Sequence, residues 1–339
     1  MTPPGPPRHS RLRWQRAALA LALAVATSAC ASDEPAAEHL PTVRFAFIPA
    51  VDHLSYLVMV DRGFDRENGF RLEETDAVGG RAALDAIAAG DADATMSGSV
   101  QALADARAGL VPATEVIVGN NTYADQKHPA MAMLVGSGID GWSDLVGATI
   151  AVNQIGSLAE VAGRIRLAQE GVTGVTFAEI ALPDQGLAVA DGAVAAAIMS
   201  EPYLTQSSRR GDGTILDWVI GGAPFPEFPY TVIVVRGSLA RDDPGLVRAF
   251  LRAHLEAVRW IDRHDGAARD LLARRLSLEP AVAEEMRVNP YVADARFDRD
   301  LLDRVQQILA AADPAATPVA VADLIDERLL GEVLSGAGG

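Results

Sequence analysis

Three short segments of small residues each precede a stretch with helical spacing. These segments are Gly79-Gly80-Arg81, Ser97-Gly98-Ser99 and Gly156-Ser157. A helix start presents backbone N–H groups that lack partners within the helix, and it carries the positive end of the helix dipole. Glycine lets a ligand approach the backbone closely, and Arg81 adds a forked cation. Three such starts facing one cleft would suit a sulfonate, carboxylate, nitrate or phosphate group.

Helix capping is the simpler role for the serines in these segments. A serine directly before a helix accepts a hydrogen bond from an N–H group of the first turn. Ser99 and Ser157 stand at such positions. Capping and ligand binding are compatible, so both roles stay open.

Other polar candidates lie in loops that follow predicted strands. Asp52 and His53 follow the first predicted strand, and Asn120, Asn121, Thr122 and Tyr123 follow a later one. The imidazole of His53 can donate to a ligand oxygen or titrate near neutral pH. An exposed loop histidine without such a role is an equally good interpretation.

Aromatic and acidic side chains leave the ligand class open. The aromatic residues that can stack on a planar ligand, or else pack in the core, are Tyr56, Tyr123, Tyr203, Phe228 and Tyr230. If Glu201 and Glu227 face the ligand, they disfavour a bare anion and suit an amine or a ring N–H donor. Small organic anions and heteroaromatic molecules therefore both remain candidates.

Several kinds of chemistry are missing from the sequence. Its single lysine, Lys127, is not part of a glycine-rich phosphate loop, and no two histidines have zinc-helix spacing. The segment Met96-Ser97-Gly98-Ser99-Val100 lacks the first glycine of a hydrolase nucleophile elbow. With one cysteine, a structural zinc site is not expected. We therefore predict no metal, no cofactor and no catalytic residue.

The N-terminus has the pattern of a secretion signal. Four arginines lead into an apolar run at residues 17–26, and the small residues Thr27-Ser28-Ala29 follow. The apolar run is shorter than the about 20 residues that span a bilayer. We predict that residues 1–29 are a signal peptide and that residues 30–41 are a tether.

The only cysteine, Cys30, stands directly behind these small residues. The arrangement resembles the bacterial lipoprotein signal, which implies acylation of Cys30 and a membrane anchor. Thr27 departs from the pattern, because leucine is usual three residues before the cysteine. An ordinary secretory signal cut nearby, which would leave a free thiol, is the alternative.

Charge and composition limit the remaining function classes. Removing residues 1–29 takes away four arginines and no acidic residue, so the formal charge changes from −16 to −20. Such an acidic surface argues against nucleic acid and against coating anionic lipid. The mature chain is long enough for two domains. The full sequence is 49% hydrophobic and 5% aromatic, a composition that fits an α/β core.

Short β-rich runs alternate with helical stretches along the chain. Alternation of this kind predicts mostly parallel sheets with helices on both faces. The predicted strands are 43–48, 70–74, 94–97, 114–118, 131–135, 148–152, 175–180, 194–199 and 230–235. The predicted helices are 54–60, 81–89, 99–108, 157–169, 186–190 and 202–209, with mainly helical sequence from Gly245 onward.

The order of these elements predicts two lobes. Lobe A comprises residues 42–132 and 233–339, and lobe B comprises residues 133–232. Crossings near 131–136 and 230–236 would form a hinge, with a ligand cleft between the lobes.

Four stretches carry a family resemblance. The first is Phe47-Ile48-Pro49-Ala50-Val51-Asp52-His53 with Asp61-Arg62-Gly63-Phe64 and Glu67-Asn68-Gly69-Phe70, and the second is Gly79 to Leu84 with Ala89-Gly90-Asp91-Ala92-Asp93-Ala94. The third is Trp142 to Val152 with Gly156-Ser157, and the fourth is Met199-Ser200-Glu201-Pro202-Tyr203. Together they resemble the solute-binding proteins of ABC importers, in the branch that covers nitrate, sulfonate, taurine and thiamine-pyrimidine precursors.

The resemblance implies a type II periplasmic-binding-protein fold and a substrate-binding lipoprotein on the outer face of the cell membrane. It implies a small-molecule solute, ABC permease and ATPase subunits as partners, a monomer, and no enzymatic activity. One departure is Ala195, which stands where the family often has an acid at the entry of a second-lobe strand.

Two alternatives to transport remain. One is a lipid-anchored sensor with the same fold. The other is a relative of pyrimidine-precursor synthases, which use a cysteine-rich iron motif, a lysine-bound cofactor and a histidine. The chain lacks cysteines beyond Cys30 and has no lysine near His53, which argues against synthase chemistry.

Overall fold

The computed structural model describes residues 40–107, 113–312 and 320–336, together with Met1. The predicted signal peptide, Cys30 and all of the predicted tether except Leu40 and Pro41 lie outside the described residues. Among the residues that are described, no helix is long and apolar enough to cross a membrane.

Five strands form the first sheet, sheet A, in the order β2-β1-β3-β10-β4. β1 is parallel to β2 and β3, whereas β10 is antiparallel to both β3 and β4. Four strands therefore share one direction, as the alternating pattern predicts. The bounds are β1 Thr42–Phe47, β2 Arg71–Asp76, β3 Ala94–Gly98, β4 Glu115–Asp125 and β10 Glu227–Arg236.

The second sheet, sheet B, repeats this plan in the order β7-β6-β8-β5-β9. β6 is parallel to β7 and β8, and β5 is antiparallel to β8 and β9. The bounds are β5 Met131–Val135, β6 Thr149–Val152, β7 Thr176–Glu179, β8 Ala196–Ser200 and β9 Thr214–Ile220. Sequence reasoning missed β9 and predicted β4 seven residues too short at its end. The other strands were predicted with small differences at their ends.

The chain crosses between the sheets twice. It leaves sheet A after Asp125 and returns at Glu227, so the crossings occupy residues 126–130 and 221–226. Both lie a few residues before the predicted positions, because β4 and β10 are longer than expected and pair from Glu227↔Asp125 onward. The lobe boundaries drawn from the sequence stay a prediction.

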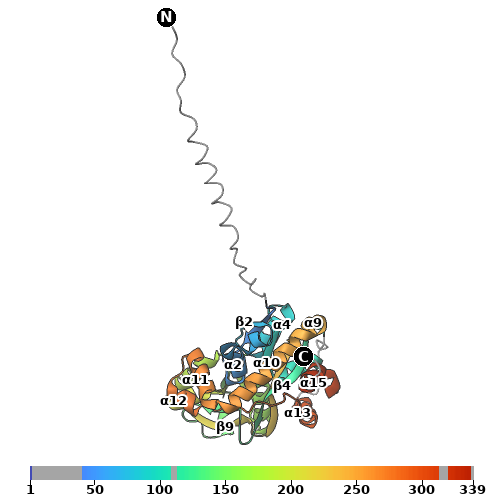
Figure 1. The fold of residues 1–339 in the computed structure, drawn as a ribbon. Coiled ribbons are helices and arrows are strands. Elements are labelled where there is room, and N and C mark those ends of the chain that lie inside the picture. The colour runs from blue at the N-terminus through green and yellow to red at the C-terminus, as the bar shows by residue number, and fades with distance from the viewer. Residues whose placement is uncertain (2–39, 108–112, 313–319, 337–339) are drawn as a thin grey trace. The chain divides into compact units, whose positions relative to one another are not determined.

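Helices connect the strands within each sheet (Figure 1). We call sheet A with its connecting helices half A, and sheet B with its connecting helices half B. The helices of half A are η1 Val51–His53, α2 Leu54–Arg62, α3 Phe64–Glu67, α4 Gly80–Ala89 and α5 Ser99–Arg107. Those of half B are η2 Trp142–Leu145, α6 Leu158–Gln169, η3 Leu182–Asp184, α7 Gln185–Ala190 and α8 Tyr203–Arg210.

After β10 the chain is mainly helical, as predicted. These helices are α9 Gly237–Asp242, α10 Pro244–Arg263, α11 Asp265–Leu276, α12 Pro280–Glu285, α13 Arg299–Ala312, α14 Val321–Leu324 and α15 Arg328–Leu334. The long helix α10 packs against α2 and α15 (Figure 1). Its predicted apolar face is confirmed, because Val247, Phe250, Leu251, His254, Leu255, Val258 and Ile261 are all buried.

One buried carboxylate ties three strands of sheet A together. Asp93, directly before β3, accepts hydrogen bonds from Arg44 N (3.0 Å) and Arg44 Nη2 (2.8 Å) on β1. It also accepts from Arg236 Nη2 (2.6 Å) at the end of β10. The hydrogen bonds and charges of both guanidinium groups lower the pKa of Asp93, although burial alone would raise it. The ion-pair network therefore aligns β1, β3 and β10 at one edge of the sheet.

Sheet B has the same pair of main-chain hydrogen bonds at the matching place, but without the charged side chains. Asp93 N donates to Arg44 O (2.7 Å) and Arg236 N donates to Asp93 O (2.8 Å). At the matching place, Ala195 N donates to Thr149 O (2.9 Å) and Gly136 N donates to Ala195 O (3.0 Å). The departure at Ala195 thus removes a network of three charged residues, while the main-chain connection stays.

We predict that Asp93→Asn lowers the free energy of unfolding by about 3 kcal/mol, because it leaves two guanidinium groups without their carboxylate. Urea unfolding near pH 7 measures the change. Asp91→Asn, which alters an exposed carboxylate in the same turn, is the matched control. The prediction fails if both variants unfold at the wild-type urea concentration.

Candidate functional site

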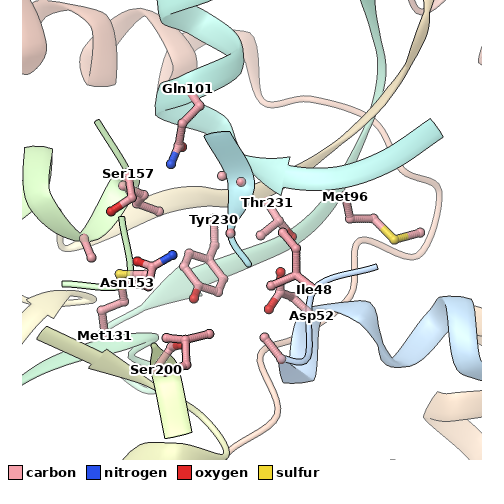
Figure 2. A pocket seen from close by; sticks show the side chains of 17 residues that line it. Ile48, Asp52, Met96, Gln101, Met131, Asn153, Ser157, Ser200, Tyr230 and Thr231 are labelled. Atoms are coloured by element: carbon pink, nitrogen blue, oxygen red, sulfur yellow. The ribbon is translucent and has the colours of Figure 1, made fainter. Parts of the chain in front are cut away.

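A cavity of about 60 Å³ lies between half A and half B. Five residues predicted for the ligand site line it, and Figure 2 shows several of them. These five are Asp52, Gly80, Gly98, Ser157 and Tyr230. They come together because each belongs to a strand end, a helix start or the central strand β10, and the carboxyl ends of parallel strands share one edge of a sheet.

Two backbone N–H groups at the start of α6 find their hydrogen-bond acceptors within half B. Ser157 is its N-cap, and the Ser157 hydroxyl accepts from Glu160 N (3.4 Å). The Glu160 carboxylate accepts in return from Gly156 N (2.6 Å). The pair differs from a capping box, because Glu160 bonds the N–H group of the residue before the N-cap. Ser157 therefore caps its helix and also lines the cavity.

Two glutamine side chains connect the helix starts across the cavity. The neighbouring donors and acceptors assign the amide of Gln101, on α5 of half A, the orientation in which Oε1 accepts from Leu158 N of α6 (2.6 Å) and Nε2 donates to Gly98 O (3.0 Å). In the opposite direction, Gln154 of half B accepts from Ala82 N of α4 (3.2 Å). Each half therefore supplies an amide oxygen to a helix start of the other half.

Glycine is needed where the halves meet. A Cβ atom at Gly98 would lie 3.2 Å from Leu158 Cβ and would crowd the amide of Gln101. At Gly79, a Cβ atom would overlap the side-chain amide of Asn153. A side chain at either position would therefore displace the amide of Gln101 or Asn153 from its place beside the cavity.

Asp52 is the single carboxylate among the described residues that line the cavity, and no lysine, arginine or histidine joins it there. Its side chain is 6% exposed and forms none of the ion pairs found in the described ranges. Burial raises the pKa of the Asp52 carboxyl to about 6, against the opposing effect of its own backbone N–H. The cavity therefore holds an uncompensated carboxylate at neutral pH.

Tyr230 and Thr231 of β10 form another part of the wall. Burial, together with the charge of Asp52, raises the pKa of the Tyr230 phenol. Ser200 of half B lines the same cavity. The Thr231 hydroxyl is held by Asn121 Nδ2 (2.9 Å) and by the hydroxyl of Thr122 (2.5 Å). These bonds hold β10 against β4 beside the cavity.

His53 lies beneath the cavity instead of at its mouth. Its Nδ1 accepts from Ile48 N (3.2 Å), and its Nε2 bonds Met96 O (2.7 Å). Burial lowers the His53 pKa to about 4. The ring is therefore neutral near pH 7 and holds the loop after β1 against β3.

Arg81 extends away from the cavity. Its guanidinium bonds Asp85 (3.0 Å) and Asp105 (2.7 Å), which are on α4 and α5. The first cause of its raised pKa is the hydrogen bond with Asp105. In this structure Arg81 links two helices of half A.

Four more half A candidates do not line the cavity: Ser97, Ser99 and Asn120 are buried, and Tyr123 is half-buried. Ser97 donates to Gly80 O (3.4 Å), and the buried Ser99 hydroxyl has no hydrogen-bond partner among the described residues. Asn120 is buried within β4, and Tyr123 follows in the same strand with its ring near His128. The prediction that both follow a strand is wrong, because β4 continues to Asp125.

Apart from Ser157, the half B candidates do not line the cavity. Gly156 adopts a left-handed conformation with φ 78° next to Ser157. Glu201 is buried and accepts from Thr205 N (3.0 Å) and Thr205 Oγ1 (2.9 Å). Tyr203 is buried in the first turn of α8.

Three further aromatic and acidic candidates belong to half A, one on α2 and two on β10. Glu227 is exposed at the start of β10 and faces Arg304 at 3.6 Å. Tyr56 stacks on Phe45 with ring centroids 4.4 Å apart, and Phe228 packs on Phe225 at 5.0 Å.

A family model for the NMT1-like family matches residues 36–277. The chain belongs to the NMT1-like family. No curated protein matches it. The three solved structures described next are each less than 25% identical to this chain. At that level of identity their similarity shows the fold alone.

The chain is 20% identical to the alkanesulfonate-binding protein SsuA from Xanthomonas axonopodis pv. citri, covering 84% of this chain and 98% of that chain, with a TM-score of 0.70. It is 14% identical to the periplasmic nitrate-binding protein NrtA from Synechocystis PCC 6803, covering 88% and 89%, with a TM-score of 0.71. The desulfurization enzyme DSZB is 18% identical, covering 87% and 99%, with a TM-score of 0.63. The predicted periplasmic-binding-protein fold is confirmed.

Several polar residues of the cavity wall were not predicted. They are Gln101, Asn153, Ser200 and Thr231. Asn153 and Ser200 stand at the carboxyl ends of β6 and β8, a position that could have identified them. Gln101 and Thr231 lie inside a helix and a strand, where the sequence gives no signal of exposure to a cavity.

A second cavity, of about 330 Å³, adjoins the first at Leu182. Phe47 and Val78 of half A and Arg275 of α11 line it, together with Pro183 of half B. The Arg275 guanidinium lies 5.0 Å from the centre of the Phe47 ring. A ligand larger than the inner cavity can extend in this direction.

We predict that Asp52→Asn stabilises the protein above pH 7. Because the Asp52 pKa is raised from 3.8 to about 6, the folded state holds its proton more tightly than the unfolded state. The contribution of Asp52 to stability therefore falls as pH rises from about 4 to about 6. A shift of this size corresponds to about 3 kcal/mol at pH 8.

Urea unfolding at pH 4, 6 and 8 checks this expectation, with the exposed Asp61→Asn as control. The gain of Asp52→Asn over wild type should grow with pH and then level off. Tyr230 and Tyr291, the other titratable groups that interact with Asp52, stay protonated throughout this range. A variant less stable than wild type at pH 8 contradicts the prediction.

Proposed function

We propose that this protein is a substrate-binding lipoprotein of an ABC importer that captures a small polar or heteroaromatic solute between its two halves. The observation that carries the proposal is the cavity itself, which both halves line with polar groups. A ligand that contacts both halves favours the closed state, because only differential binding shifts such an equilibrium. Binding proteins for alkanesulfonate and nitrate among the structural neighbours support it.

We further propose that no bond is made or broken in the cavity. One structural neighbour is an enzyme, so the point needs a test. His53 has both ring nitrogens engaged by backbone groups, and the Ser157 hydroxyl accepts from Glu160 N. Neither side chain forms a nucleophile–base pair with the other groups described around the cavity. These contacts favour binding over catalysis.

Export and anchoring belong to the same proposal. Cys30 would carry the acyl chains that hold the protein on the outer face of the cell membrane, where it would meet a permease and its ATPase as a monomer. Mass spectrometry of the mature N-terminus tests the anchor. An acylated Cys30 is the expected result, and an unmodified peptide that begins elsewhere would contradict it.

A thermal-shift screen with sulfonates, nitrate, carboxylates and aminopyrimidines tests the binding function. A ligand of the native state raises the melting temperature in a saturable way. Asn153→Ala should weaken its binding about fivefold, by loss of one hydrogen bond of about 1 kcal/mol. Asn68→Ala, which changes an amide bonded to Glu256 outside the cavity, should bind like wild type.

The same samples separate binding from catalysis. After prolonged incubation, mass spectrometry should recover the bound solute unchanged. Conversion of the solute to a product, or binding that ignores every substitution in the cavity wall, would overturn the proposed function.

A further inference from the structure

At two helix starts near the cavity, one first-turn N–H group already has an acceptor from the other half. Leu158 N at the start of α6 donates to Gln101, and Ala82 N at the start of α4 donates to Gln154. An oxyanion would need these first-turn N–H groups, which are the usual basis of anion binding at a helix start. The neutral amide oxygens of glutamine take that place here.

The charge in the cavity has the wrong sign for an anion. Asp52 is buried on the cavity wall, and the described wall residues include no cationic side chain to offset it. The Arg81 guanidinium is held outside by Asp85 and Asp105. A buried carboxylate without a partner repels an anion and gains strongly from a charge-assisted hydrogen bond.

The surroundings of Asp52 complete a site for a donor group. In the view of Figure 2, the Tyr230 ring lies between Asp52 on one side and Asn153 with Ser157 on the other. An aromatic face next to a carboxylate favours a cation or a flat N–H-bearing group. The cavity volume of about 60 Å³ limits the part of the ligand held there to a small group.

We propose that the cavity binds the cationic or N–H-donating group of its solute, such as an amine, an amidine or a protonated nitrogen heterocycle, against the carboxylate of Asp52, and that it does not bind a bare oxyanion. This inference rests on the proposed function and narrows its ligand class. The remainder of a larger solute would extend toward the second cavity at Leu182.

Matched pairs of ions with nearly the same shape test the inference. Guanidinium and nitrate are both flat and threefold, and acetamidinium and acetate share one outline. Each ion is added to the purified protein as its chloride or sodium salt, with sodium chloride as the ionic-strength control. Guanidinium and acetamidinium should raise the melting temperature saturably at millimolar concentration, whereas nitrate and acetate should match sodium chloride.

Asp52→Asn should abolish the response to both cations, and Asp61→Asn should leave it unchanged. A saturable response to nitrate or acetate, or no response to either cation, overturns the inference. Retention of the cation response in Asp52→Asn also overturns it. If a sulfonate binds in the thermal-shift screen and its binding depends on Asn153, this inference is wrong while the proposed function stands. The two failures are therefore distinguishable.

Discussion

Two hydrogen bonds from backbone N–H groups to glutamine side chains, one in each direction, join the halves of this protein. The first-turn N–H groups of a helix need acceptors that the helix itself does not provide. Leu158 N finds one in Gln101, and Ala82 N finds one in Gln154. Closing the cavity therefore satisfies helix ends that an open cleft would leave to water. Gly79 and Gly98 leave room for the amides of Asn153 and Gln101, which a side chain at either position would displace.

The geometry of half A also depends on the Asp93 ion-pair network, which lies at the ends of the strands away from the cavity. Asp93 holds Arg44 of β1 and Arg236 of β10 at the sheet edge where β3 begins. The opposite ends of β1 and β3 lead into Asp52 and Gly98, which line the cavity. A rigid network at one edge thus positions binding groups at the other. Half B reaches the same backbone arrangement with Ala195, without the charges.

The sequence predicts the alternating elements well because each has its own hydrophobic pattern. The stripe along α10 is an example, and every residue predicted for it is buried. The strand β9 was missed because Thr214–Ile220 combines exposed and half-buried positions at a sheet edge, which leaves no clear alternation. The polar run Asn120-Asn121-Thr122 suggests a loop, yet it continues β4, where Asn121 and Thr122 bond Thr231. Contacts across the cavity depend on closure of the whole molecule, so neither Gln101 nor Gln154 could be identified from local sequence.

Small-angle X-ray scattering of the ligand-free protein tests the central claim most directly. If the paired glutamines hold the halves closed, the double variant Gln101→Ala/Gln154→Ala should have a larger radius of gyration than wild type. The control is Gln169→Ala/Gln307→Ala, which changes two exposed glutamines and should scatter like wild type. Equal radii for wild type and the Gln101/Gln154 variant would contradict the account.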